Sequence, residues 1–434
     1  MGASRSGCVG LVVTFPASIW RFGSLALIAG LVSCGARTGL DAPDAQIDAG
    51  MDAGPPPPPP PLCVDVPVDD PRVRVDLEIP ASLRVVDVMF LIDSTASMQD
   101  EIDSVRERLR DRVVPGVREL IPDAAFGVAL FGEFPVAPHA LAGDDVGPFL
   151  LRTPITTDVV RIETALARTP VWGNLDDPEA AIEGLFQVAT GAGLEPFIEA
   201  SVGCPSGGVG GACFRDDAFR IVMLVTDAPM HNGPPDVSPV SNYERVRPAP
   251  HTYLETVEAT RALDLFVIGL AASDAGRPSA FQHLVALARD TESVDGAGDP
   301  IVFDIGGRGD RIGAGIVDAV RRVAEEVPLD VDATVEDRPG DALDALDVVR
   351  AIHARSADPA SGIAGMDGSR FLGVRPGTRL TFELEIDASE LPPSPARREF
   401  AARVIFRESG RSRIEVRDIV IVVPGDDGLG CEDE

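Results

Sequence analysis

The sequence contains no lysine, so all 38 basic residues among its 434 are arginines. Acidic residues number 69, and the net charge at pH 7 is −31. Because a surface of this sign repels phosphate backbones and anionic lipid headgroups, nucleic acid and anionic membrane surfaces are disfavoured as partners. The absence of lysine indicates a GC-rich genome rather than a particular chemistry.

Histidine is also scarce. The five histidines stand at positions 139, 231, 251, 283 and 353, without an H-x-x-x-H pattern, so a catalytic zinc site is unsupported. His231 follows Asp227 by four positions, and we expect it to orient the loop after Asp227 rather than to ligate a hard cation. DSTAS at 93–97 lacks the glycine and the second copy that an aspartic protease needs. No nucleophile–base pair is evident in the sequence, which argues against an enzyme.

The N-terminal apolar run, residues 22–33, is too short to cross a bilayer comfortably. Arg5 and Arg21 precede it and Cys34 follows it, which is the pattern of an export signal. LVSC at its end resembles the lipobox of bacterial lipoproteins. The resemblance implies cleavage before Cys34, a lipid on its thiol, and an outer-membrane or cell-surface location. An ordinary secretion signal or an uncleaved anchor is the alternative.

Export would place the chain where disulfides are permitted. Apart from the cysteine of the signal and the one expected to carry lipid, four remain: Cys63, Cys204, Cys213 and Cys431. Four cysteines allow three pairings. Cys204 and Cys213 bracket a glycine-rich loop and are expected to pair locally, and Cys63 with Cys431 would then join the ends of the folded region. The alternative is that some of them are free.

Composition divides the chain into successive regions. Residues 1–33 are the predicted signal peptide, and 34–62 are a low-complexity Asp/Ala/Gly and proline-rich segment. Such a segment cannot bury a core, and its proline run favours an extended tether rather than a calcium loop. Residues 83–327 are the predicted α/β domain, 330–425 a β-rich domain, and 426–434 an acidic tail.

Apolar runs typical of buried strands alternate with helical apolar stripes between residues 83 and 327. Strands are expected at 85–93, 124–133, 219–227, 263–272 and 301–305. Helices are expected from 97 to about 120, from 178, at 253–263 and 279–290, and from 310 to about 326. This alternation predicts a doubly wound, mostly parallel sheet flanked by helices. Ligands of such sheets bind beyond the carboxyl ends of the strands, where Asp93, Glu133 and Asp227 stand.

In the β-rich region apolar residues recur at every second position, as in strands with one exposed face. Segments 379–387, 398–408 and 413–424 alternate apolar and polar residues, with Gly or Pro between them. They predict a smaller antiparallel domain that resembles a β-sandwich.

Hydroxyls and carboxylates are concentrated in three separated stretches: DSTASMQDE at 93–101, WGNLDDPE at 172–179 and VTDAPMHN at 225–232. The predicted fold would bring them together at one edge of the sheet. Such hard oxygen ligands suit Mg²⁺, Mn²⁺ or Ca²⁺. No single loop can fill a coordination shell, so water or an oxygen of a bound ligand must complete it.

In this order the three stretches resemble the metal-ion-dependent adhesion site of von Willebrand factor A (VWA) domains, and most closely the I-like domain of integrin β subunits. The likeness covers roughly residues 85–325. It implies a central Mg²⁺, or Mn²⁺ or Ca²⁺, held by Asp93, Thr95, Ser97, Glu179 and Asp227. It implies an adjacent ion at Asp100, Glu101 and the backbone of Ser97. A third ion would use Glu133, Asn174, Asp176, Glu179 and the Pro178 carbonyl, with Ca²⁺ an alternative at both flanking sites.

Local explanations exist for each stretch. Thr95 and Ser97 could simply cap a helix, and Asp176 and Glu179 could place favourable charge at a helix N-terminus. Glutamates also stand at two flanking positions where the family has aspartate, which weakens the flanking sites. RGD at 308–310 is expected to be a chance tripeptide whose aspartate caps the last helix.

Taken together, the sequence predicts a lipid-anchored surface protein that binds a protein or glycan ligand through a divalent cation, the ligand supplying a carboxylate. The membrane would be contacted only through the N-terminal lipid. A structural envelope protein that uses the metal for stability is one alternative. A metal-dependent hydrolase, which would need a general base beside the ion, is the other.

Overall fold

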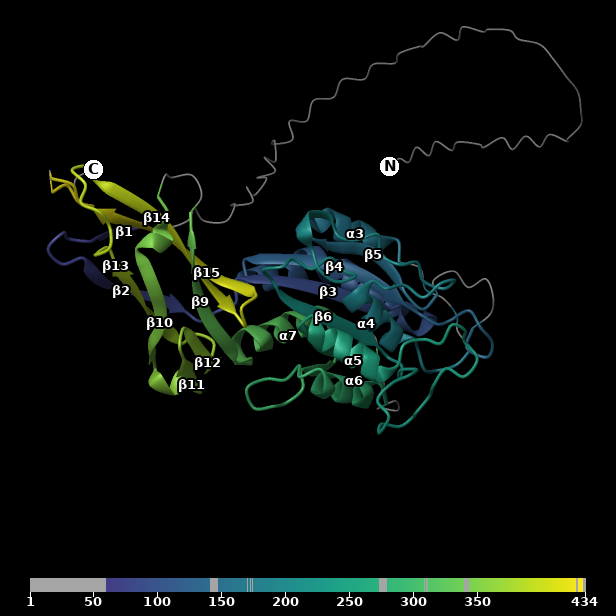
Figure 1. Ribbon diagram of the computed structural model, residues 1–434. Coiled ribbons are helices and arrows are strands. Elements are labelled where there is room, and N and C mark those ends of the chain that lie inside the picture. The colour runs from purple at the N-terminus through teal and green to yellow at the C-terminus, as the bar shows by residue number, and fades with distance from the viewer. Residues whose placement is uncertain are drawn as a thin grey trace, which may run out of the picture. The chain divides into compact units, whose positions relative to one another are not determined.

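The structure is a computed structural model that describes residues 60–140, 147–169, 171, 173, 175–272, 279–307, 309, 311–338, 343–426 and 428–431 (Figure 1). All of these belong to one compact unit, Pro55–Glu434. The predicted signal peptide, Cys34 and nearly all of the predicted tether lie outside the described residues. Within the described part, no helix is both long enough and apolar enough to cross a membrane.

A six-stranded sheet forms the centre of the α/β region, in the order β5-β4-β3-β6-β7-β8 (Figure 1). Its strands are β3 (Val85–Asp93), β4 (Asp123–Phe131), β5 (Leu150–Thr156), β6 (Phe219–Thr226), β7 (Leu265–Ala271) and β8 (Val302–Asp304). Every neighbouring pair is parallel except β4 with β5. This is the mostly parallel sheet that the sequence predicts.

The central strand β3 is buried along its whole length. Because successive strand residues point to opposite faces, its side chains divide between two apolar cores. Phe90 and Ile92 pack into one core, and Met89 and Leu91 pack into the other. A strand covered on both faces needs a nearly continuous apolar sequence, which VVDVMFLID supplies.

Helices cover both faces of this sheet (Figure 1). They are α1 (Gln99–Arg108), α2 (Val114–Leu120), α3 (Val159–Ala167), α4 (Ala181–Thr190), α5 (Tyr253–Ala262), α6 (Ser279–Asp290) and α7 (Ile312–Glu326). Side chains of α1, α2, α3 and α7 pack into the core that contains Phe90. Those of α4, α5 and α6 pack into the core that contains Met89. The sheet is therefore doubly wound, as expected.

The first helical region is more complex than the single helix expected from 97 to about 120. A 3₁₀ turn at Ala96–Met98 precedes α1, and a π-helical segment at Leu109–Val113 separates α1 from α2. Pro115, in the first turn of α2, has no N–H to donate to the carbonyl four residues earlier, so the regular hydrogen-bond ladder is interrupted there. Leu109 and Val113 are buried in the π-helical segment as they would be in an α-helix. The spacing of apolar residues therefore did not distinguish the two kinds of helix.

The edge strand β5 and the helix α3 are absent from the sequence prediction. LLRTPIT, the sequence of β5, is mostly half-buried and contains Pro154, which is tolerated at a sheet edge and weakens the strand pattern. The Asp158 side chain caps α3 by accepting from the N–H groups of Val160 and Arg161. That capping pattern was the available indication of a helix start.

The rest of the unit is built of β-strands: β1 (Leu62–Asp65), β2 (Arg72–Pro80), β9 (Leu329–Asp337), β10 (Val349–Asp358), β11 (Gly365–Asp367), β12 (Arg370–Val374), β13 (Arg379–Asp387), β14 (Arg398–Glu408) and β15 (Ser412–Val423). Short 3₁₀ turns lie at Pro205–Gly207 in the α/β region and at Ala345–Asp347 and Ala360–Gly362 here. One sheet has the order β1-β15-β14-β9-β12-β11, and a second has the order β10-β13-β2. Two sheets with alternating burial agree with the predicted sandwich-like arrangement.

This β region differs from the expected range of 330–425 because β1 and β2 precede the α/β region in the chain. β2 pairs with β13 in antiparallel register, whereas β1 pairs with β15 in parallel. The sequence of β2, RVRVDLEIP, alternates as an exposed strand should, so the pattern was present before residue 83 but was not read as a strand. The α/β region is therefore inserted between strands of the β region.

Both disulfides favoured by the sequence are present. Cys204 pairs with Cys213 across the glycine-rich loop, and Cys63 of β1 pairs with Cys431, 368 positions later. The Cys431 N–H also donates to Asp65 Oδ1 at 2.8 Å. The long-range disulfide restricts the unfolded chain and fastens β1 to the C-terminal segment.

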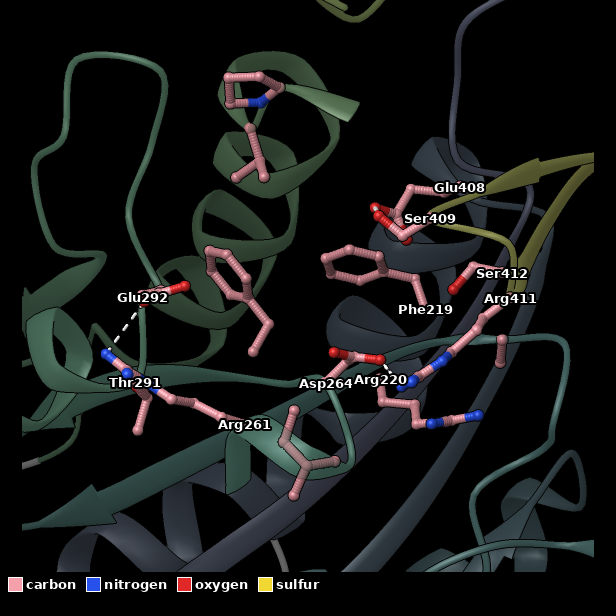
Figure 2. A pocket seen from close by; sticks show the side chains of 15 residues that line it. Phe219, Arg220, Arg261, Asp264, Thr291, Glu292, Glu408, Ser409, Arg411 and Ser412 are labelled. Atoms are coloured by element: carbon pink, nitrogen blue, oxygen red, sulfur yellow. Dashed lines mark hydrogen bonds and ion pairs between the residues drawn. The ribbon is translucent and has the colours of Figure 1, made fainter. Parts of the chain in front are cut away.

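A pocket of about 310 Å³ lies at the amino ends of β6 and β7 (Figure 2). Phe219 and Arg220 of β6 line it, together with Asp264 just before β7. Figure 2 shows Asp264 directed toward Arg411 of the β14–β15 turn, with which it forms an ion pair. The pocket is thus at the opposite ends of the strands from the acidic loops, away from the edge where sheets of this kind bind ligands.

Arg215 ties the segment before β6 to β3 and β4. Its Nε and backbone N–H donate to the two carboxylate oxygens of Asp87 at 2.7 and 2.6 Å, and its Nη1 donates to Asp123 at 2.6 Å. Asp87 is fully buried in β3, and burial raises its pKa although Arg215 opposes the shift. Arg215 therefore compensates a carboxylate that would otherwise be isolated in the core.

We expect Arg215→Ala to lower the free energy of unfolding by about 3–5 kcal/mol, because it leaves the Asp87 carboxylate buried without its cation. Chemical denaturation measures this change. The matched control is Arg321→Ala, which breaks only an exposed pair with Asp318 and should cost less than about 1 kcal/mol. Adding Asp87→Asn to Arg215→Ala should recover part of the loss. Equal effects of the two arginine variants would contradict this role.

Candidate metal centre

Acidic residues stand where three neighbouring strands end. Asp93 is the last residue of β3, Glu133 follows β4 by two positions, and Asp227 directly follows β6. Because β4, β3 and β6 are adjacent and parallel, all three acids lie at one edge of the sheet. Glu179 joins them from the segment before α4, where its N–H donates to the Pro229 carbonyl at 2.9 Å.

The Asp93 carboxylate is fully buried and is held by three hydrogen bonds. The Thr95 N–H and hydroxyl donate to Oδ1 at 2.9 and 2.7 Å, and the Thr226 hydroxyl donates to Oδ2 at 2.7 Å. Burial and the charge of Asp227 raise the pKa of Asp93 to about 7, against the effect of these hydrogen bonds. The carboxylate is therefore fixed in orientation at a place that disfavours its charge.

Ser97 connects the first acidic loop to the third. Its Oγ donates to Asp227 Oδ1 at 3.0 Å and lies 3.2 Å from Thr95 Oγ1. Thr95 occupies the N-cap position of the 3₁₀ turn, yet its side chain makes no capping hydrogen bond. The two hydroxyls thus face the carboxylates instead of the helix end, which disfavours the capping explanation. Ser97 is exposed, so this side of the cluster is open to solvent.

Glu179 shows how strongly the like charges interact. Burial, followed by the charges of Asp93 and Glu133, raises the pKa of Glu179 to about 12. Several acids cannot all be ionised in so buried a place unless a cation offsets their charge. Carboxylate and hydroxyl oxygens form the donor set that Mg²⁺, Mn²⁺ and Ca²⁺ prefer, so the residues present fit a divalent ion of this class.

The side chains expected at the adjacent ion lie in the first turn of α1. Asp100 is exposed and Glu101 is buried on the first turn of α1. Gly309 packs against α1, because a Cβ there would lie 2.7 Å from Glu101 Cα. Gly309 is the middle of the RGD tripeptide and is buried, whereas Arg308 and Asp310 lie outside the described residues.

The residues expected at the third ion are joined by two histidines. His139 Nδ1 lies 2.7 Å from Asp176 Oδ2, and His231 Nε2 lies 3.1 Å from the same oxygen. Burial acts to raise the pKa of Asp176, but hydrogen bonds and charge from His231 and His139 outweigh it, so this pKa is lowered. Pro178 lies in the same segment, between Asp176 and Glu179. Asn174 lies outside the described residues.

Sequence reasoning missed several residues of this region. Thr226 directly precedes Asp227 in the VTD stretch, so its position at a strand end could have identified it. His139 had no local pattern to mark it, because its place depends on the course of the chain after β4. His231 was expected to orient the loop after Asp227, and its N–H does donate to the Glu179 carbonyl at 2.9 Å.

Comparison with known proteins gives a partial match. No family model matches the chain. Integrin beta-6 of rat, mouse and human is 24% identical to this chain over 163 residues. The match covers 34% of this chain and 18% of each integrin, so the chain corresponds to under a fifth of the length of these relatives.

Two solved structures are also similar. A von Willebrand factor type A protein from Catenulispora acidiphila is 12% identical, with a TM-score of 0.34 and coverage of 82% of this chain and 70% of that one. The open conformation of the pilus adhesin SpaC from Lactobacillus rhamnosus GG is 12% identical, with a TM-score of 0.34 and coverage of 81% and 45%.

The sheet order, the helices on both of its faces and the match to integrin beta-6 make the α/β region similar to a von Willebrand factor A domain. Its sequence is similar over 163 residues to part of the integrin beta-6 subunit.

Glu179 and Glu183 allow a matched test of the electrostatics of this centre. In a chelating buffer at pH 7, Glu179→Gln should leave the Tm within about 2 °C of wild type, because a protonated acid and an amide carry the same charge. Glu183 is buried on α4 and accepts from Gln187 Nε2 and the His251 N–H at 2.8 and 2.9 Å. Glu183→Gln should therefore cost about 1–3 kcal/mol. Thermal and chemical unfolding measure both, and a larger loss for Glu179→Gln would contradict this account.

Proposed function

We propose that the VWA-like domain binds a carboxylate-bearing protein or glycan ligand through a divalent cation. The cation is held by Asp93, Thr95, Ser97, Glu179 and Asp227. The observation that carries this proposal is the direction of the Thr95 and Ser97 hydroxyls, which hydrogen-bond to Asp93 and Asp227 rather than to the helix that follows. Mg²⁺ is the proposed ion, with Mn²⁺ and Ca²⁺ as chemically similar alternatives.

The open side of the cluster supports ligand binding. Ser97 is exposed while Asp93 and Glu179 are buried, so the acids form the floor of the site and the hydroxyl lies at its rim. A divalent ion on this floor has positions left for water, and a carboxylate of the ligand can replace that water. The similarity to integrin beta-6 supports adhesion as the kind of function.

Ligand capture by immobilised protein tests the proposal. From surface extracts we expect capture in Mg²⁺, loss in EDTA, and loss in Asp227→Ala, which removes a central acid. Asp236→Ala changes an exposed acid further along the same loop and should bind as wild type. Capture that survives both EDTA and Asp227→Ala would refute adhesion through the metal.

Chemical modification of the captured ligand tests whether its carboxylate makes the contact. Amidation of its carboxyl groups should abolish binding, because the proposed contact is between a ligand carboxylate and the cation. A purely structural role for the ion would instead lower the Tm in EDTA without changing capture. A hydrolase would release a cleaved product, and Glu179→Gln would stop that release.

We further propose that a lipid on Cys34 anchors the protein and that residues 34–62 lift the domains from the membrane. LVSC supports the lipid, and the proline run at 55–61 supports a semi-rigid spacer. In the source organism, wild-type protein should fractionate with membranes and enter the detergent phase of a phase-separation assay. Cys34→Ser should move it to the soluble phase, whereas Cys8→Ser should not. Soluble wild-type protein would contradict the anchor.

A further inference from the structure

We propose that Glu133, His139, Asp176 and His231 form a second metal site, which binds a first-row transition ion of the zinc class. One ligand atom from each of these four side chains lies within 4.8 Å of the others. Glu133 and Asp176 are also in the ligand set of the third ion that the resemblance implies, but His139 and His231 are not, and they replace an oxygen-only donor set with a mixed nitrogen and oxygen set. The inference stands on its own geometry and does not depend on adhesion.

The spacing of the donor atoms suits a small ion. His139 Nδ1 and His231 Nε2 lie 2.7 and 3.1 Å from Asp176 Oδ2, and His231 Nε2 lies 3.5 Å from Glu133 Oε2. A tetrahedral ion with ligands at about 2.0–2.2 Å holds them about 3.3–3.6 Å apart. Small movements would therefore place all four around one ion.

Burial and origin make this a built site. The side chains of Glu133 and His231 are 2% exposed and that of His139 is 8% exposed. They come from three separate segments, after β4, before α4 and after β6. A metal here would cross-link all three segments.

Neighbouring groups orient the ligands as they do around bound metals. His231 Nδ1 lies 2.9 Å from the Ser241 hydroxyl, so Nε2 is the nitrogen that faces the carboxylates. The Tyr243 hydroxyl donates to Glu133 Oε1 at 2.6 Å. Glu133 Oε2, on the cluster side, has no hydrogen-bond donor within the described part of the chain. In both His231 and Glu133, one polar atom is therefore hydrogen-bonded outside the cluster, and the other faces the remaining ligands.

The close approach of His231 to the carboxylates requires a positive charge or a proton between them. An unprotonated nitrogen of His231 facing two carboxylates is repulsive, so either a proton on the imidazole or a metal ion must lie between them. Imidazole nitrogens with carboxylates favour Zn²⁺, Mn²⁺, Fe²⁺ or Co²⁺ over Mg²⁺ and Ca²⁺. With four protein ligands the site is closed, which is typical of a structural ion.

Such an ion would stabilise the segments that carry the central site. The His231 N–H donates to the Glu179 carbonyl at 2.9 Å, and Asp176 lies three residues before Glu179. The position of Glu179 is therefore tied to two of the four ligands. Occupancy by the zinc-class ion would hold the floor of the central site in place before Mg²⁺ or a ligand arrives.

Titration of the chelator-stripped full-length chain with Co²⁺ tests the site, because four-coordinate Co²⁺ with nitrogen ligands absorbs strongly in the visible range. We expect one equivalent to bind with this absorption, Zn²⁺ to displace it, and excess Mg²⁺ to leave it unchanged. His139→Gln combined with His231→Gln should weaken Co²⁺ binding at least 100-fold. His251→Gln, a histidine paired with Glu183 outside the cluster, should bind as wild type.

Two controls keep the outcomes distinct. Asp227→Ala should lose Mg²⁺-dependent ligand capture and keep Co²⁺ absorption, so failure of the adhesion proposal and failure of this one give different results. Circular dichroism in EDTA verifies that the double histidine variant folds, and His231→Gln alone serves if it does not. Absence of the absorption, its persistence in the histidine variant, or its loss in Asp227→Ala would overturn the proposal.

Discussion

Acidic side chains that converge on a buried sheet edge require an opposite charge, or protons, to offset them. In this protein the parallel order of β4, β3 and β6 brings Glu133, Asp93 and Asp227 to one edge, and Glu179 completes the group. The raised pKa values of Asp93 and Glu179 express the cost of this convergence. The hydroxyls, the backbone pairing of the loops and the nearby histidines are all arranged around these acids.

The sequence predicts the sheet well because its strands are buried on both faces. A strand such as β3 must be apolar at nearly every position, and this pattern can be recognised from the sequence of the strand alone. The central acids were predictable for a related reason. Strand ends are marked by the change from apolar to polar residues, and the fold class fixes which ends meet. Thr226 could have been predicted in the same way, because it is the last residue of β6.

Features that depend on neighbours were not predictable in this way. The edge strand β5 is mostly half-buried and contains Pro154, so its strand pattern is weak. The strand β2 alternates clearly, but it precedes the α/β region and pairs with β13, which follows that region in the chain. The π-helical segment follows from the position of Pro115 within an otherwise regular stripe. His139 meets Asp176 only because the chain after β4 returns to the sheet edge, and no local periodicity records that path.

Insertion of the α/β region between strands of the β region has a mechanical consequence. The chain crosses between the two regions at residues 81–84 and again at 327–328. A force applied at the acidic edge is therefore shared by two covalent connections, whereas a terminal domain would depend on one. The Cys63–Cys431 disulfide passes tension on β1 directly to the segment after β15. The α/β region is therefore held to the β region at two points of the chain, so neither connection alone carries the whole of such a force.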